Sequence, residues 1–151
     1  MSGDDLSHPA VIRCAQCSDA SSVAELLTAL GYPSSVAQVE RRLAEHLTSA
    51  HSAVFVAESD RRAVGCLSFH CIPMFHEDGF LGRITSLVVA PEYRAHGIGR
   101  RLVVAAEDFA RTHGCLRVEV TSGDHRLAAH AFYEHLGYRC DCRRFIKHQL
   151  D

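Results

Sequence analysis

Apolar residues recur along the first half of the chain with two periods, one typical of strands and one of helices. Short apolar runs at 11–17, 53–57 and 63–72 predict strands, and the turn residues Ser59-Asp60 between the last two predict a hairpin. Between the first two runs the apolar residues recur every three or four positions, which predicts two amphipathic helices. Their inward residues are Val23, Leu26, Leu27 and Leu30 in the first helix and Val36, Val39, Leu43 and Leu47 in the second.

The ends of these two helices carry residue types that begin and stop helices. Ser18-Asp19 precedes the first helix, and Ser34 or Ser35 begins the second. Ser and Asp are expected here because their side chains cap helix N-termini. Gly31-Tyr32-Pro33 ends the first helix, since glycine favours the left-handed turn there and the residue before a proline avoids helical backbone.

A second alternation of strands and helices fills the rest of the chain. A strand is expected over 83–90, a helix from about 97 to 112, a strand over 116–120, a helix that ends at Gly137, and a final strand over 138–148. The complete order is β-α-α-β-β-β-α-β-α-β. A hairpin followed by strand–helix–strand crossovers predicts an α/β (α+β) fold, with a mixed, mostly antiparallel central sheet and helices on both faces.

The junction between strand 83–90 and the following helix carries the most informative motif, Arg94-x-x-Gly97-x-Gly99. Glycines let the backbone approach a ligand closely, and the first turn of a helix presents unpaired N–H groups and a partial positive charge. Together these features suit a phosphate group. The same glycines also fit a tight strand-to-helix turn that binds nothing. The spacing differs from the dinucleotide fingerprint and from the nucleoside triphosphate P-loop.

A second motif lies downstream, Glu119-Val-Thr-Ser122 followed by Ala-Ala-His-Ala-Phe-Tyr-Glu-His-Leu-Gly-Tyr over 128–138. Together with Leu87-Val88-Val89 and the glycine motif, it resembles the GNAT superfamily of N-acetyltransferases, with the motifs in the family's order and at its usual separation. The resembling stretch runs from about 84 to 138. It implies the fold expected above, acetyl-CoA as the cosubstrate, and transfer of the acetyl group to an amine.

The resemblance implies roles for particular positions. Backbone groups of Leu87, Val88 and Val89 would pair with the pantetheine arm, and a backbone N–H near Val88, in a strand bulge, would polarise the thioester carbonyl. Tyr133 would protonate the leaving thiolate, although its residue pattern alone also fits simple packing. The pyrophosphate would lie against the loop residues Arg94, Ala95, His96, Gly97, Ile98, Gly99 and Arg100.

Arginines and one glutamate complete the candidate site. Arg100 and Arg126 are candidates to pair with cofactor phosphates, because a guanidinium forks onto phosphate oxygens. Two positions depart from the family: Arg126 replaces a common asparagine, and Arg83 replaces a common glutamate early in the fourth strand. Glu119, on the polar face of the neighbouring strand, is then the candidate base, or only a solvated residue. Its rivals are a water chain and the side chains of His70, His76, Glu77 and Asp124.

Length and composition are those of one globular domain over 11–151, preceded by a flexible tail over 1–10. The chain has 151 residues, of which 47% are hydrophobic and 23% charged, and its net charge is −2. This charge gives no electrostatic footprint for nucleic acid, and no apolar run is long enough for a membrane helix. Without the pattern of a signal peptide, a cytoplasmic location is expected.

Seven cysteines and eleven histidines raise the question of metal or redox chemistry. Cys14-x-x-Cys17 lacks a second pair of ligands at zinc spacing, and no two histidines have the spacing of a metal-binding helix. We therefore expect no metal site. No cysteine lies where its thiol would be activated, so direct attack of the amine on the thioester is favoured over an acetyl-enzyme.

The sequence therefore predicts an N-acetyltransferase that moves acetyl from acetyl-CoA directly to a primary amine. The acceptor is expected between the first two helices, the loop 73–79 and the strand ends at Arg83 and Glu119. Acidic side chains in that region favour a small cationic acceptor; they are Glu77, Asp78, Glu119 and Asp124. Acetylation of a protein amine, a non-catalytic acyl-CoA sensor, and a scaffold or homodimer whose loop binds nothing remain alternatives.

Overall fold

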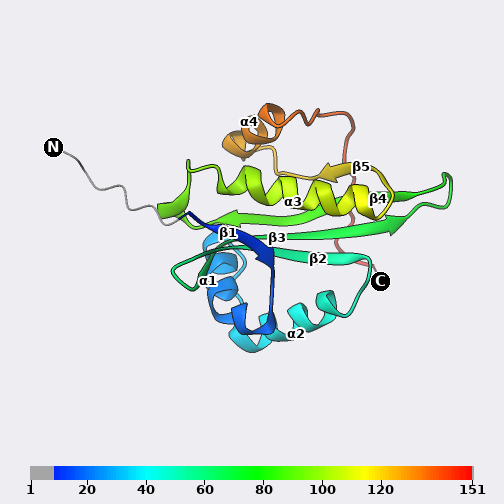
Figure 1. Cartoon of the computed structure of the whole chain (residues 1–151). Helices are drawn as coiled ribbons and strands as arrows, with labels where there is room; N and C mark the ends of the chain where they lie inside the picture. The colour runs from blue at the N-terminus through cyan, green and yellow to red at the C-terminus, as the bar shows by residue number, and fades with distance from the viewer. Residues whose placement is uncertain (1–8, 151) are drawn as a thin grey trace. The chain divides into compact units, whose positions relative to one another are not determined.

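The computed structural model of the chain describes residues 9–150 (Figure 1). They form two compact units, one that ends at Thr121 and one that begins at Ser122. The first unit contains, in order, β1 (Val11–Cys14), a 3₁₀ turn η1 (Cys17–Asp19), α1 (Ala20–Leu30), α2 (Val36–Leu47), β2 (Ser52–Ser59), β3 (Arg62–Pro73), β4 (Phe80–Val89), a second 3₁₀ turn η2 (Pro91–Tyr93), α3 (Ile98–Thr112) and β5 (Cys115–Val120). The second contains α4 (Leu127–His135).

The five strands form one open sheet in the order β1-β2-β3-β4-β5. All neighbours are antiparallel except β4 and β5, which run parallel because α3 crosses over between them. Helices α1 and α2 cover one face of the sheet and α3 covers the other (Figure 1). The predicted mixed, mostly antiparallel sheet with helices on both faces is confirmed.

The core forms where the predicted helix faces meet the sheet. Val23 and Leu26 of α1 and Val39 and Leu43 of α2 are buried in one cluster with β2 and β3. The predicted inward residues at the two ends of α2, Val36 and Leu47, are instead exposed, because only the middle turns of the helix lie over the sheet.

On the other face, α3 packs closely against β3 at Gly65. A Cβ atom there would lie 3.1 Å from Leu102 Cδ1 and 3.2 Å from Ile98 Cγ2, so the absence of a side chain lets the helix approach. Ile98, Leu102 and Val103 are fully or almost fully buried. This contact fixes where the first turn of α3 begins, immediately after the glycine motif.

The cap predicted for α1 is wrong in its chemistry. Asp19 occupies the N-cap position, but its carboxylate makes no bond to the helix. It accepts hydrogen bonds from Arg13 Nη1 and Nη2, both at 2.8 Å, and from the Gln16 N–H. A full positive charge binds a buried carboxylate more strongly than a helix amide does. At α2 the prediction is confirmed, since Ser35 caps the helix in a reciprocal box with Gln38.

Two predicted boundaries at the N-terminal side are also shifted. The first strand ends at Cys14 rather than at Cys17, and Cys17 is already the first residue of η1. Most of the tail predicted over 1–10 lies outside the described residues. Ala10 is buried and its carbonyl accepts a hydrogen bond from Arg101 Nη1 at 2.6 Å, so ordered structure begins earlier than expected.

The second unit lacks the final strand predicted over 138–148. No strand is assigned after β5 in the described chain, and 139–150 are exposed. A strand needs a partner and a continuous apolar face. Here Arg143-Arg144 interrupts the apolar alternation, and the adjacent Phe145 and Ile146 would point to opposite faces. The segment therefore offers no face long enough to bury.

Within residues 9–150, no helix combines the length and the apolar character that crossing a bilayer requires. The same residues contain no gathering of three or more His, Cys, Asp or Glu side chains able to hold a metal ion. All seven cysteines are free thiols.

Candidate functional site

The backbone between β4 and α3 is shaped to present amide groups. Ala95 and Gly97 both have left-handed backbone, with φ of 65° and 77°. Gly97 is the N-cap of α3, and no side chain among the described residues caps this helix. The first amide with a partner within the helix is that of Arg101, which donates to the Gly97 carbonyl at 3.1 Å. The N-terminus of α3 is thus open to an anion.

The arginines of this loop are placed differently from one another. Arg94 turns back toward the strand, where its Nε donates to the Val89 carbonyl at 3.0 Å. Arg100, in the first turn of α3, is exposed. Arg101 is bound to Ala10, as described above. Arg126, at the N-cap of α4, belongs to the second unit.

Next to this loop, β4 has an edge without a partner strand. The parallel pairing with β5 runs from Phe80 to Ile84 and ends there. From Ser86 to Val89, β4 pairs with β3 alone among the described strands. Leu87, Val88 and Val89 therefore lie on a strand segment that offers backbone groups to a ligand, in the way an unpaired edge does.

The same segment begins with a β-bulge. Ser68 pairs with Ser86 and Phe69 pairs with Ile84, which leaves Thr85 as an extra residue in β4. A bulge disturbs the regular ladder and redirects the groups around it. This bulge lies at Thr85, three residues before Val88, near which the family resemblance placed one.

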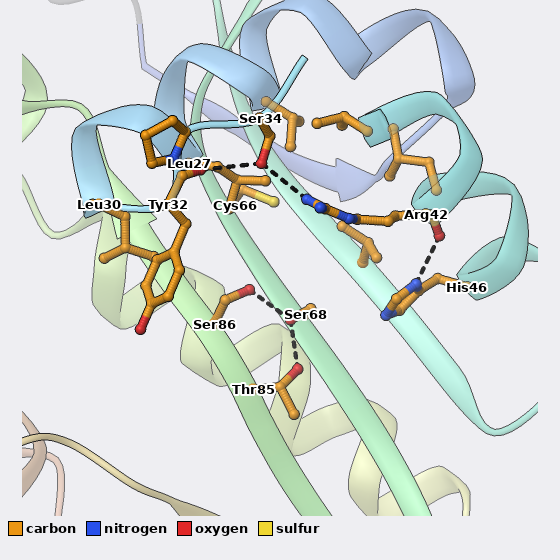
Figure 2. Close-up of a pocket in the computed structure, with 16 residues that line it drawn as sticks. Leu27, Leu30, Tyr32, Ser34, Arg42, His46, Cys66, Ser68, Thr85 and Ser86 are labelled. Atoms are coloured by element: carbon orange, nitrogen blue, oxygen red, sulfur yellow. Dashed lines mark hydrogen bonds between the residues drawn. The ribbon is translucent and has the colours of Figure 1, made fainter. Parts of the chain in front are cut away.

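A cavity of about 720 Å³ opens beside the bulge, between α1 and α2 on one side and β3 and β4 on the other (Figure 2). Its strand wall carries three hydroxyl groups, with Ser68 Oγ 2.7 Å from Thr85 Oγ1 and 2.6 Å from Ser86 Oγ. Its helix wall combines apolar side chains with Arg42 and His46. No carboxylate lines it among the described residues. A volume of this size suits a small molecule.

The chain is similar to known proteins. The sequence matches the acetyltransferase (GNAT) family over residues 21–138. The chain belongs to this family. The open helix terminus and the unpaired β4 edge both lie within the residues that match the family.

Individual relatives agree with this assignment. An aminoalkylphosphonate N-acetyltransferase of Salmonella typhimurium is 37% identical over 84 residues, which are 56% of this chain and 54% of the relative. A glucosamine 6-phosphate N-acetyltransferase of Trypanosoma brucei brucei is 35% identical over 92 residues, 60% of each. The matches thus span less than two thirds of either relative. The crystal structure of a Trypanosoma brucei acetyltransferase superposes with a TM-score of 0.77 and 30% identity, over 94% of this chain and 99% of that one.

One thiol lines the cavity of this GNAT chain, that of Cys66 on β3. Burial raises its pKa to about 12, and the nearby negative charge of Asp19 adds to the effect. Because the thiolate is the reactive form of cysteine, this side chain is a poor nucleophile near neutral pH. The arrangement suits direct attack by a substrate amine.

Glu119 lies in an ion-pair cluster outside the cavity lining. Its carboxylate accepts hydrogen bonds from Arg117 Nε at 2.9 Å and Arg83 Nη2 at 3.0 Å. Mainly through the bond from Arg117, these two cations lower the pKa of Glu119 below its usual range. The carboxylate is therefore charged but weakly basic. Arg83, which replaces the family's glutamate, is the direct partner of this candidate base.

The rival bases also lie outside the cavity lining. His70 Nδ1 is 2.9 Å from Ser52 Oγ, and burial lowers the pKa of its ring. His76 and Glu77 are exposed in the loop between β3 and β4, and Asp124 belongs to the second unit.

Tyr133 lies on α4, within the second unit. Its ring packs edge-on against Phe132 and Tyr138, with centroids 5.1 Å and 5.8 Å away. Burial raises the pKa of the phenol, so it stays protonated across the physiological range. A protonated phenol suits the role of proton donor and also suits packing.

Arg42 and His46 are the site residues that the sequence reasoning missed. Figure 2 shows both projecting from α2 into the region above β3 and β4. Arg42 Nη1 donates to Ser34 Oγ at 2.9 Å, and His46 Nδ1 lies 2.7 Å from the Arg42 carbonyl. A signal existed: both share the helix face of Val39 and Leu43, at offsets of three and seven from Val39. Val39 and Leu43 on this face are buried, whereas Arg42 is exposed and His46 half-buried, so the polar residues mark where the face opens into the cavity.

Proposed function

We propose that this protein is an N-acetyltransferase that moves the acetyl group of acetyl-CoA directly to the primary amine of a small molecule. The observation that carries the proposal is one continuous arrangement in the first unit. An uncapped helix terminus follows an unpaired strand edge, and that edge begins at a bulge in the wall of a small-molecule cavity. Membership of the GNAT family supports acetyl-CoA as the cosubstrate.

The cofactor-binding roles follow from the backbone. Amides from Arg94 to Arg100 would hold the diphosphate, because uncapped N–H groups and the helix dipole favour an anion. The edge at Leu87, Val88 and Val89 would pair with the amide groups of the pantetheine arm. Arg100 and Arg126 would add guanidinium contacts to phosphate. Bound acetyl-CoA supplies the thioester that the amine attacks.

The bulged part of β4 would polarise the reacting carbonyl. A strand amide released from the ladder donates to an oxygen that gains negative charge during acyl transfer, and such donors lower the barrier. We place this donor between Thr85 and Val88. Direct transfer is supported by the high pKa of Cys66, the thiol of the cavity wall.

Acetyl transfer requires a proton donor for the leaving thiolate and a proton acceptor for the attacking amine. Tyr133 would donate a proton to the leaving thiolate, and its raised pKa keeps that proton available. Glu119 remains a candidate to receive the proton of the amine through water, although its ion pairs weaken it as a base. His46 is a second candidate from the cavity wall. Its Nδ1 faces a carbonyl, which only accepts, so the neutral ring keeps the lone pair of Nε2 available.

The structure alters the argument about the acceptor. The acidic residues that favoured a cationic molecule do not line the cavity, and Glu119 is neutralised by Arg83 and Arg117. We therefore restrict the proposal to a small primary amine. A protein amine, a homodimer and a cytoplasmic location stay predictions from the sequence.

Release of free CoA on mixing the protein with acetyl-CoA and a panel of amines tests the proposal. We expect thiol release that depends on both the protein and the amine, together with a rise in Tm when acetyl-CoA alone is added. A rise in Tm without thiol release for any amine would favour a non-catalytic acyl-CoA sensor. No rise in Tm would favour a scaffold whose loop binds nothing.

A further inference from the structure

We propose that the acceptor carries an acidic group in addition to its amine, and that Arg42 binds this group at the α2 side of the cavity. The acidic group is an oxyanion: a phosphonate, a phosphate or a carboxylate. The inference rests on the proposed acetyl transfer for the identity of the cavity, and it adds the chemical class of the acceptor.

The first reason to expect an acidic group on the acceptor is the charge of the cavity. Arg42 carries the positive charge of its guanidinium, and no acidic side chain of the described residues lines the cavity with it. Arg42 also forms no salt bridge with any described residue, although five other arginines of the chain do; these are Arg13, Arg62, Arg83, Arg111 and Arg117. A cavity whose one permanent charge is positive favours a molecule with a negative group.

The second reason is the orientation of the Arg42 guanidinium. Ser34 Oγ accepts a hydrogen bond from Arg42 Nη1 and lies 3.1 Å from the Tyr32 carbonyl, to which it donates. The hydroxyl thus connects the guanidinium to the turn between α1 and α2. With Nη1 held there, the edge formed by Nε and Nη2 is left for a ligand. That edge presents two parallel N–H groups, which is the geometry that two oxygens of an oxyanion accept.

The third reason is the way polar groups are distributed over the cavity wall. Arg42 and Ser34 lie on the helix side, whereas Ser68, Thr85 and Ser86 lie on the strand side at the bulge (Figure 2). Leu27, Leu30 and Leu43 add apolar surface to the same cavity. A bifunctional molecule fits this division, with its acid at Arg42 and its amine near the bulge, where the thioester carbonyl would be polarised.

The alternative is that Arg42 only stabilises the turn by bonding Ser34. The two accounts differ in what the loss of the charge changes. A purely structural contact affects the Tm and leaves the choice of acceptor unaltered. A binding contact alters the choice of acceptor and leaves acetyl-CoA affinity unchanged.

The test compares four amines of similar chain length: an aminoalkylphosphonate, an amino acid with a terminal amine, an amino alcohol and a diamine. Arg42→Gln removes the charge, and Arg41→Gln is the matched control, because both arginines are exposed on α2 and only Arg42 lines the cavity. Each variant is measured for kcat/KM with each amine, for Tm, and for calorimetric binding of each amine to the CoA-loaded protein.

We expect the wild type to favour one or both acid-bearing amines over the alcohol and the diamine, and the phosphonate and carboxylate arms tell which acid is preferred. Arg42→Gln should lower kcat/KM and affinity for the acid-bearing amine about 10- to 100-fold, the usual effect of losing hydrogen bonds to a charged group. Arg42→Gln should change kcat/KM and affinity for the amino alcohol less than about twofold. Arg41→Gln should leave kcat/KM and affinity unchanged for both kinds of amine.

Equal use of all four amines, or equal losses for acid and alcohol in Arg42→Gln, would overturn the inference while leaving acetyl transfer intact. If acetyl-CoA binds and no amine releases CoA, the proposed function fails instead. The binding measurement still decides the inference in that case: Arg42-dependent binding of the acid-bearing amine supports it, and the absence of such binding refutes it.

Discussion

The β4–α3 loop and the α1–α2 cavity adjoin the same strand segment but differ in how they are built. The loop acts through its backbone: left-handed residues at Ala95 and Gly97 and an uncapped helix terminus, with no side-chain cap. The cavity acts through side chains, with Arg42 and His46 facing three hydroxyls. A cofactor shared across a family needs only the first kind of site. In the proposed function, the acceptor, which differs between the relatives, would be selected by the second.

The largest effect expected is at Tyr133, which belongs to neither region. Tyr133→Phe removes the proposed proton donor and should lower kcat by about 10²- to 10⁴-fold, with little change in acetyl-CoA affinity. Steady-state kinetics and a binding titration measure the two quantities. Tyr138→Phe is the control, because Tyr138 packs against the same ring. Equal kcat for wild type and Tyr133→Phe would remove this residue from the mechanism.

A partly buried ion pair holds the start of α1, a helix that lines the cavity, so the comparison can also be tested through stability. Asp19→Asn removes the carboxylate that binds Arg13 at the start of α1, and should lower the free energy of unfolding by about 3 kcal/mol. Chemical denaturation measures this change. Under conditions in which Asp19→Asn is still folded, its affinity for acetyl-CoA should equal that of the wild type. Retained stability in Asp19→Asn would show that the pair contributes nothing net.

The same pair gives a pH dependence with a definite sign. The hydrogen bond from Arg13 lowers the pKa of Asp19 in the folded protein below its ordinary value of 3.8. The pair therefore stabilises the protein above about pH 4, and this stabilisation is lost as the pH falls through the lowered pKa. Wild type should lose stability below pH 4 more steeply than Asp19→Asn, in denaturation series at several pH values. Parallel curves would contradict the assignment.

The loop side can be perturbed without touching the cavity. Gly97→Asp places a negative charge at the proposed diphosphate site, and should weaken acetyl-CoA binding by about 100-fold in calorimetry. Gly114→Asp is the matched control, because Gly114 has nearly the same backbone, with φ of 75° against 77°, at the other end of α3. Equal weakening in both variants would mean that backbone strain, rather than charge at the loop, is responsible.

The smallest expected effect separates the two candidate bases. Because Arg117 and Arg83 lower the pKa of Glu119, a profile governed by this residue would fall off only at acidic pH, and Glu119→Gln would abolish that limb. If His46 receives the proton, His46→Gln should lower kcat/KM about tenfold, and the acidic limb should persist in Glu119→Gln. The pH profile of kcat/KM in both variants distinguishes them.

The backbone conformation of the loop was easier to predict from the sequence than the side chains of the cavity, for physical reasons. Glycines at Gly97 and Gly99 are needed wherever the backbone turns sharply or is approached closely, so their spacing alone indicates the loop. The order of strands and helices follows from apolar periodicity, and the sheet confirmed it. The acceptor site depends instead on which side chains on α2 face the sheet.

Three particular residues show where local reasoning fails. Arg42 and His46 lie among many charged residues of α2, and only the position of the helix over β3 and β4 shows that they face a cavity. Asp19 has the residue type of a helix cap, but both oxygens of its carboxylate accept hydrogen bonds from Arg13 on β1 instead. Tertiary contacts of this kind override local preferences. The absent final strand has the same cause, since a strand forms only with a partner and a face to bury.

The central claim is that backbone amides between Arg94 and Arg100 hold the diphosphate of acetyl-CoA beside the unpaired edge of β4. A crystal structure of the protein soaked with acetyl-CoA tests it most directly. We predict phosphate oxygens within hydrogen-bond distance of amides of this loop, and pantetheine atoms paired with Leu87, Val88 or Val89. A well-ordered coenzyme bound elsewhere, or a loop left empty at saturating acetyl-CoA, would contradict the account.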